Sequence, residues 1–205
     1  MTARKTVLAA SKASHTMKPL FVFDDIRSPG RTFLFTIAGV RIEATRHARM
    51  APMTWLLFGL LIAALEADRG SVVSVVAKAA AYATALYSTN VLHSLGHIVA
   101  GRIVGTPMHV LLLTSTRDVT LFPALPSNSP VGVRVGRSLG GPAANIGVAL
   151  LCFTLATPLS TPWLESFAIV NLAVGLWTLC PIPTMDGWVI WRGLFRGRSR
   201  EQSNR

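Results

Sequence analysis

The chain contains four long apolar stretches separated by more polar connections. They cover approximately residues 52–65, 71–104, 139–156 and 167–180. A helix needs roughly 20 predominantly apolar residues to cross the hydrocarbon core of a bilayer. The stretches differ in length and contain small and polar residues, as is typical of membrane helices that surround a polar site. The pattern therefore predicts about four transmembrane helices.

Short segments with β-type patterns lie outside these stretches. Residues 31–49 combine apolar alternation with several arginines, which predicts one or two strands at the membrane surface. Residues 110–113 and 119–122 are apolar, β-branched runs on either side of a polar turn, a pattern typical of a hairpin. Three prolines within 123–130 exclude a continuous helix there. The predicted fold class is an all-α polytopic membrane protein with a small membrane-surface β hairpin or strands.

The composition agrees with a membrane protein. Hydrophobic residues occupy 51% of the 205 positions and charged residues only 14%, whereas an average soluble domain has about 25% charged residues. We expect one membrane domain over residues 31–195. Residues 1–30 are expected to form a basic, partly disordered arm, and residues 196–205 a basic tail.

Positive charge is concentrated at the two ends of the chain. Nine of the 20 Lys and Arg residues lie in the first 50 positions and five follow Asp186, whereas residues 157–166 contain none. Cytoplasmic loops of membrane proteins are enriched in Lys and Arg. Four helices with both termini in the cytoplasm fit this distribution. The basic ends are expected to contact the lipid bilayer. No nucleic-acid-binding motif is recognisable in the sequence, so we expect no nucleic-acid partner.

The beginning of the sequence also bears on location. Residues 1–31 contain no apolar core of the length that a secretory signal has. We therefore expect the inner (plasma) membrane of a bacterium or archaeon, with an organelle-targeting segment as the weaker alternative.

Two histidines lie four residues apart inside the second apolar stretch. On a helix, His93 and His97 project from one face. Their spacing suits a tetrahedral zinc ion, which accepts imidazole nitrogen at about 2.0–2.1 Å. The alternative is two unrelated histidines, one packed and one reaching toward the membrane surface. Uncompensated polar side chains are costly in an apolar span and usually functional, which favours the metal site.

A third metal ligand has to come from elsewhere in the chain. Asp186 follows the fourth apolar stretch and two prolines, Pro181 and Pro183. Prolines interrupt a helix and leave backbone groups without their helical hydrogen bonds. At membrane depth this is tolerated mainly where the backbone lines a cavity or is buried in protein. The alternative is a carboxylate that caps a helix or marks the membrane boundary.

These residues resemble the site-2 protease family of intramembrane zinc metalloproteases. That family carries His-Glu-x-x-His on one membrane helix, Gly-Pro-x-x-Asn on the next and an Asn-x-x-Pro-x-x-x-x-Asp-Gly-like sequence on a later one. In the same order, the chain has His-Ser-Leu-Gly-His at 93–97, Gly-Pro-Ala-Ala-Asn at 141–145 and Pro-Ile-Pro-Thr-Met-Asp-Gly at 181–187. Any one of these motifs is weak, but the three together are specific. The resemblance covers roughly residues 31–195.

The resemblance implies a role for each matching residue. His93, His97 and Asp186 are the expected zinc ligands. Asn145 is expected near the substrate or a developing oxyanion, with an amide that bonds across packed helices as the alternative. The expected substrates or clients are transmembrane segments of other membrane proteins. A membrane complex or homo-oligomer is an open expectation.

Two positions depart from the family pattern. The family's glutamate, which accepts a proton from the attacking water, is replaced by Ser94. A serine hydroxyl has no proton affinity near neutral pH, so we expect impaired hydrolysis. Thr178 stands where the family has an asparagine three residues before the proline, so we expect weaker contacts with a bound substrate. We expect no other carboxylate to replace the glutamate, with Asp118 as the one candidate that could fold toward the site.

Three functions follow as alternatives. The first is a zinc peptidase of this lineage that cleaves membrane-anchored proteins within the bilayer, with impaired activity. The second is a non-catalytic membrane subunit, or pseudoenzyme, that binds transmembrane helices of partner proteins without cutting them and keeps zinc for structure. The third is a transporter, which is disfavoured because the sequence lacks repeated discontinuous spans.

Overall fold

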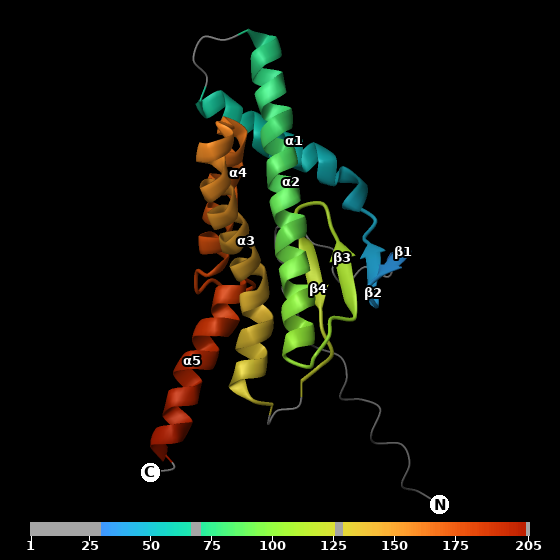
Figure 1. The fold of residues 1–205 in the computed structure, drawn as a ribbon. Coiled ribbons are helices and arrows are strands. Elements are labelled where there is room, and N and C mark those ends of the chain that lie inside the picture. Colours follow the sequence, from blue (N-terminus) through green and yellow to red (C-terminus); the bar gives the residue numbers. More distant parts are fainter. Residues whose placement is uncertain (1–29, 67–70, 126–128, 204–205) are drawn as a thin grey trace, which may run out of the picture.

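The computed structural model describes residues 30–66, 71–125 and 129–203, and Figure 1 shows how its elements are arranged. The elements are, in chain order, β1 (Thr32–Ile37), β2 (Val40–Ala44), the 3-10 helix η1 (Ala48–Met50), α1 (Ala51–Leu65), α2 (Val72–Ile103), β3 (Val110–Leu113), β4 (Asp118–Leu121), α3 (Val131–Leu159), α4 (Pro162–Thr178) and α5 (Asp186–Ser203). The predicted arm lies outside the described residues except for Gly30. Most of the predicted tail continues helix α5.

Helices dominate the described part of the chain, and three of them are long and apolar enough to cross a bilayer. They are Ala48–Leu65, which joins η1 to α1, and helices α2 and α3. The fourth predicted span corresponds to α4, whose 17 residues give a length of about 26 Å, slightly short of a hydrocarbon core of about 30 Å. The protein is an integral membrane protein, and the predicted fold class is confirmed.

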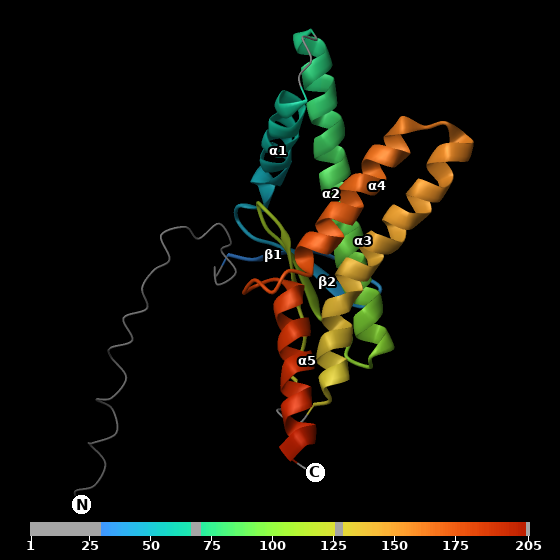
Figure 2. The ribbon, with the colours of Figure 1, turned by 90° about the vertical axis from the view of Figure 1, so that its left-hand side faces the viewer.

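The boundary between the last two predicted spans was wrong. A connection was expected over 157–166, but α3 continues to Leu159 and α4 starts at Pro162. Proline is favoured in the first turn of a helix because its missing N–H would be unpaired there in any case. Ser160 adopts a left-handed conformation, with φ of 47°, and reverses the chain within two residues. The two helices therefore form a tight antiparallel pair, which Figure 2 shows clearly.

The strands form a single sheet in the order β1-β2-β3-β4. The predicted hairpin is present as the antiparallel pair β3 and β4, with Leu113 opposite Asp118 and Leu111 opposite Thr120. Strands β2 and β3 pair in parallel, with Ile42 opposite Leu111. This pairing makes one sheet from segments on either side of α1 and α2, so β4 becomes an edge strand beside α2.

One face of the sheet packs against α2. Val40 and Ile42 of β2 and Leu111 of β3 form a buried cluster with Met108 and with Ile98 of α2. Side chains of residues that are directly opposite in a sheet point to the same face. The register therefore also directs Asp118 and Thr120 of β4 toward α2.

Helices α2 and α3 cross at very short range on the other side of α2 from the sheet (Figure 1). A Cβ atom on Gly96 would collide with the carbonyl oxygen of Gly140, and one on Gly140 would collide with that of Gly96. Small residues at such crossings let membrane helices approach closely. The crossing brings the start of the Gly141–Asn145 motif against the helix face that carries both histidines.

Candidate metal centre

Three ligand-type atoms meet where α2, α3 and α5 come together. The Nε2 atom of His93 lies 3.0 Å from Oδ2 of Asp186 and 3.1 Å from Nε2 of His97. The Nε2 atom of His97 lies 3.3 Å from the same carboxylate oxygen. A tetrahedral zinc ion with bonds of about 2.0–2.1 Å requires ligand atoms roughly 3.3 Å apart. The three atoms therefore have the spacing of one face of such a tetrahedron.

The other ring nitrogen of each histidine has a protein partner. Nδ1 of His97 lies 2.8 Å from the backbone carbonyl oxygen of Arg137, to which it can only donate. This bond places the ring proton on Nδ1 and leaves Nε2 free to bind a cation, as in many metal sites. His97 is almost fully buried, and its side chain is 4% exposed. Its orientation is therefore fixed by the packing of α2 against α3.

Asn145 is the corresponding partner of His93. Its Nδ2 lies 3.2 Å from Nδ1 of His93, while its Oδ1 is buried without a hydrogen-bond partner. Rotation of an amide by half a turn exchanges its oxygen and nitrogen at almost no change in shape. The rotated amide would accept a hydrogen bond from Nδ1–H of His93 and leave Nε2 for the cation. Asn145 has no exposed surface, so this contact is well shielded from water.

A glycine lies directly over the ligand atoms. A Cβ atom on Gly141 would collide with Nε2 of His93 and Nε2 of His97. The absence of a side chain leaves room at the point toward which both nitrogens converge. This space and the donor set of two imidazoles and one carboxylate, which is common in catalytic zinc sites, fit a bound zinc ion.

The segment between α4 and α5 positions Asp186. It contains Pro181 and Pro183, and Thr184 has a φ of 80°, which is unusual for a β-branched residue. A Cβ on Gly187 would collide with the carbonyl oxygen of Leu179. The indole Nε1–H of Trp191 donates a hydrogen bond to that same oxygen over 3.0 Å. The first turn of α5 is therefore held against the end of α4.

Thr178, the second position that departs from the expected motif, lies at the end of α4. Its hydroxyl donates a hydrogen bond to the carbonyl oxygen of Gly175, one turn earlier in the same helix, over 3.0 Å.

A cavity of about 550 Å³ opens onto the candidate metal centre. His97 and Asp186 line it together with Thr120 of β4, Phe122 just after that strand and Trp188 of α5. The Arg137 guanidinium stacks on the Phe122 ring, 4.1 Å from its centroid. The cavity therefore reaches two of the three candidate ligand residues.

Asp118 contacts Ser94, the residue next to His93, although the sequence predicts that no other carboxylate replaces the family's glutamate. The hydroxyl of Ser94 donates a hydrogen bond to Oδ2 of Asp118 over 3.4 Å. Burial raises the pKa of the Asp118 carboxyl from its ordinary 3.8 to about 6, although hydrogen bonds from Ser94 and Asn90 act in the opposite direction. The β-type alternation of 118–121 contains the signal, but only the strand register shows which face points to α2.

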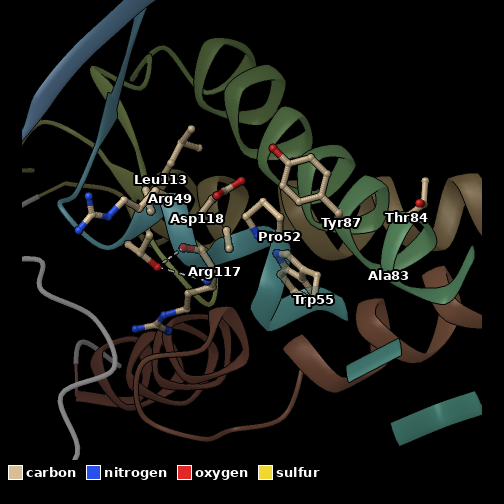
Figure 3. A pocket seen from close by; sticks show the side chains of 12 residues that line it. Arg49, Pro52, Trp55, Ala83, Thr84, Tyr87, Leu113, Arg117 and Asp118 are labelled. Carbon is tan, nitrogen blue, oxygen red and sulfur yellow. Dashed lines mark hydrogen bonds between the residues drawn. The ribbon is translucent and has the colours of Figure 1, made fainter. Parts of the chain in front are cut away.

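Asp118 also lines a second cavity, of about 400 Å³, between α1, α2 and the β3–β4 turn. Figure 3 shows Trp55 and Tyr87 in the wall of this cavity, with the guanidinium groups of Arg49 and Arg117 directed away from the Asp118 carboxylate. The carboxylate thus lies between this cavity and the helix that carries both histidines.

Comparisons with known proteins support the fold. No protein-family model matches the chain, and no curated protein matches its sequence significantly. Among solved structures, the chain is similar to "Site-2 Protease from Methanocaldococcus jannaschii", with a TM-score of 0.57 and 20% sequence identity. The alignment covers 81% of this chain and 72% of that one. At this identity the likeness establishes a shared fold.

Proposed function

We propose that the protein is a site-2-protease-like intramembrane zinc metalloprotease whose peptide hydrolysis is impaired at Ser94. The observation that carries the proposal is the convergence of His93, His97 and Asp186 at zinc-ligand spacing within a membrane protein. These residues would hold the ion, which when bound supplies Lewis acidity toward the scissile carbonyl and lowers the pKa of water. The fold shared with a protein called a site-2 protease supports this assignment.

The surrounding residues have supporting tasks in this proposal. Asn145 and the carbonyl of Arg137 orient the two imidazoles, and Gly141 keeps space beside them. The cavity at the site receives an extended segment from the transmembrane region of another protein. We place both termini in the cytoplasm of a bacterial or archaeal plasma membrane because Lys and Arg are concentrated at both ends.

Ser94 limits the reaction. General acid–base catalysis contributes about 10²–10⁴ in rate, and a hydroxyl alone does not replace a carboxylate as the proton acceptor. Slow cleavage is therefore expected from the native chain. Introducing the missing carboxylate by Ser94→Glu is expected to raise the cleavage rate, by at most the factor that general acid–base catalysis supplies.

The experiment compares zinc content and cleavage in the purified full-length chain. We expect about one zinc per chain in the native protein and in His109→Ala, which removes an exposed histidine outside the site. His97→Ala is expected to lose the zinc. Cleavage of a membrane-anchored reporter by the native chain and by Ser94→Glu is then measured in detergent or in vesicles. Zinc content that is equal in His97→Ala and His109→Ala contradicts the proposed site.

A non-catalytic subunit that binds transmembrane helices is the second candidate. The replacement of the family's glutamate by Ser94 favours it, because metal binding and packing do not need that carboxylate. In this case the protein binds zinc, yet neither the native chain nor Ser94→Glu cuts the reporter. Cross-linking to a transmembrane segment without cleavage would then identify the client.

A further inference from the structure

The sequence lacks a carboxylate at position 94, but the structure brings one into contact with that position from a different element. Asp118 reaches Ser94 from strand β4, and the two side chains are joined by the 3.4 Å hydrogen bond. Ser94 is itself buried, with 3% of its surface exposed. The contact therefore joins the sheet to α2 at the residue next to the ligand His93.

The geometry of α2 places this contact on the flank of the candidate metal centre. Ser94 follows His93 directly and precedes His97 by three residues, so its side chain points to the side of α2 next to both imidazoles. Ile98, one turn further along, packs into the sheet core. Residue 94 therefore projects into the space between the sheet and the metal ligands, where Asp118 lies.

Asp118 is also the acidic side chain best placed for this task among the described residues. Glu43 forms ion pairs with Arg31 and Arg41, and Glu66 accepts a hydrogen bond from Tyr82. Glu165 lies in the first turn of α4. Asp186 is assigned to the metal.

A carboxylate on the apolar face of a sheet opposes folding unless its charge is compensated. Burying a charged group without an ion-pair partner is costly. The groups that face or surround Asp118 are Ser94 and Asn90 from α2, Tyr87 from the same helix, and the more distant arginines 49 and 117. Its bonds to hydroxyl and amide groups compensate the charge only partly, which is typical of functional positions rather than of structural ones.

We propose that Asp118 accepts, through the Ser94 hydroxyl, the proton that peptide hydrolysis removes from the attacking water. This inference rests on the proposed protease function and names the group that replaces the family's glutamate. Asp118 acts through Ser94, so it is a positioning and proton-accepting residue, while Ser94 contacts the reacting water.

The proton balance of the step is complete without another reagent. An O–H bond of water breaks as its oxygen bonds to the scissile carbonyl carbon, and the proton passes to the oxygen of Ser94. The Ser94 hydroxyl proton moves at the same time to the Asp118 carboxylate. The C–N bond then breaks, and the proton returns from Asp118 through Ser94 to the leaving nitrogen. The products are a carboxyl group and an amine.

The pKa of Asp118 suits this role. Burial raises it to about 6, and a general base is most effective when its pKa lies near the working pH. The base must be deprotonated, so activity that depends on Asp118 rises as the pH increases through about 6 and then levels off.

Four variants of the zinc-loaded full-length chain test the proposal: Asp118→Asn, Asp118→Glu, Ser94→Ala, and Ser94→Glu combined with Asp118→Asn. We expect Asp118→Asn and Ser94→Ala to lower kcat for the membrane-anchored reporter by about 10²-fold or more, with KM and zinc content unchanged. Asp118→Glu keeps a carboxylate and should therefore retain part of the native kcat, more than Asp118→Asn does. The double variant should cleave, because the carboxylate introduced at position 94 then makes Asp118 unnecessary.

An independent readout follows the carboxyl group itself. The infrared band of a protonated, buried carboxyl should disappear as the pH rises through about 6. This change should be missing in Asp118→Asn, and its midpoint should move to higher pH in Ser94→Ala, which loses a hydrogen bond to the carboxylate.

Two results would overturn the inference while leaving the zinc protease intact. In the first, Asp118→Asn cleaves as fast as the native chain with the same pH profile. In the second, the native chain is inert and Ser94→Glu cleaves equally well with or without Asp118. If no form of the chain cleaves the reporter, the proposed hydrolysis and the role of Asp118 fail together.

Discussion

Replacing Asp118 with asparagine should stabilise the fold while it impairs the reaction. The substitution keeps the size of the side chain and its capacity for hydrogen bonds, but removes the buried negative charge. The pKa of the Asp118 carboxyl is raised from 3.8 to about 6 in the folded chain, which means that folding disfavours the charged form. A charge-neutral side chain avoids this cost at neutral pH.

The sign and size of the effect follow from proton linkage. Between pH 4 and 6 the folded chain holds a proton on Asp118 that the unfolded chain has released, so stability falls as the pH rises through this window and is lowest above about 6. A shift of about two pKa units corresponds to at most about 3 kcal/mol. Asp118 keeps some contact with solvent, so we expect about 2 kcal/mol at pH 7.5 and little difference near pH 4.

Thermal unfolding of the metal-free chain in detergent, with a chelator present at every pH, measures this difference. For a chain of this size, about 2 kcal/mol corresponds to a Tm that is roughly 4–8 °C higher in Asp118→Asn at pH 7.5. Glu165→Gln serves as the control, because it removes a carboxylate at the start of α4, far along the chain from the sheet. An Asp118→Asn variant that is less stable at pH 7.5, or whose gain is the same at pH 4, would refute the reasoning.

Three further predictions concern the residues around the candidate site. Gly141→Ala should abolish zinc binding, because its methyl group would collide with the Nε2 atoms of both ligand histidines. Gly147→Ala is the control on the same helix and should bind zinc normally, because the space around residue 147 is open. Equal zinc content in the two variants would contradict the assigned metal site. Asn145→Ala should weaken zinc affinity by about 10–100-fold, as measured by chelator competition, and unchanged affinity would exclude an orienting role. Trp191→Phe removes the donor to the carbonyl of Leu179 and should cost about 1 kcal/mol, seen as a lower Tm, whereas a native Tm would show that this bond does not hold α5.

Local patterns in the sequence predicted those parts of the structure that depend on neighbouring residues. The spacing of His93 and His97 requires one helix face, and the apolar stretches require membrane helices. The alternation around residues 110–122 requires a hairpin, which is observed with nearly the expected bounds. Each of these features is set by a periodicity of 3.6 or 2 residues that can be read directly from the chain.

Long-range pairing could not be predicted in this way. The parallel alignment of β2 with β3 joins segments separated by two membrane helices, and no local pattern encodes that register. The same register decides that Asp118 faces α2. Helix α5 was also not anticipated, and its last residues, 196–203, were interpreted as part of a basic tail.

The position of Asp118 changes how the substitution at Ser94 is understood. A lone serine in a zinc-type site indicates lost chemistry, because the proton acceptor is missing. A serine that donates a hydrogen bond to a carboxylate with a pKa of about 6 retains an acceptor one hydrogen bond further away. The longer path adds a second proton movement, so a slower reaction is expected rather than none. A carboxylate with a raised pKa that contacts the ligand helix at Ser94 is more simply explained by such a role than by packing.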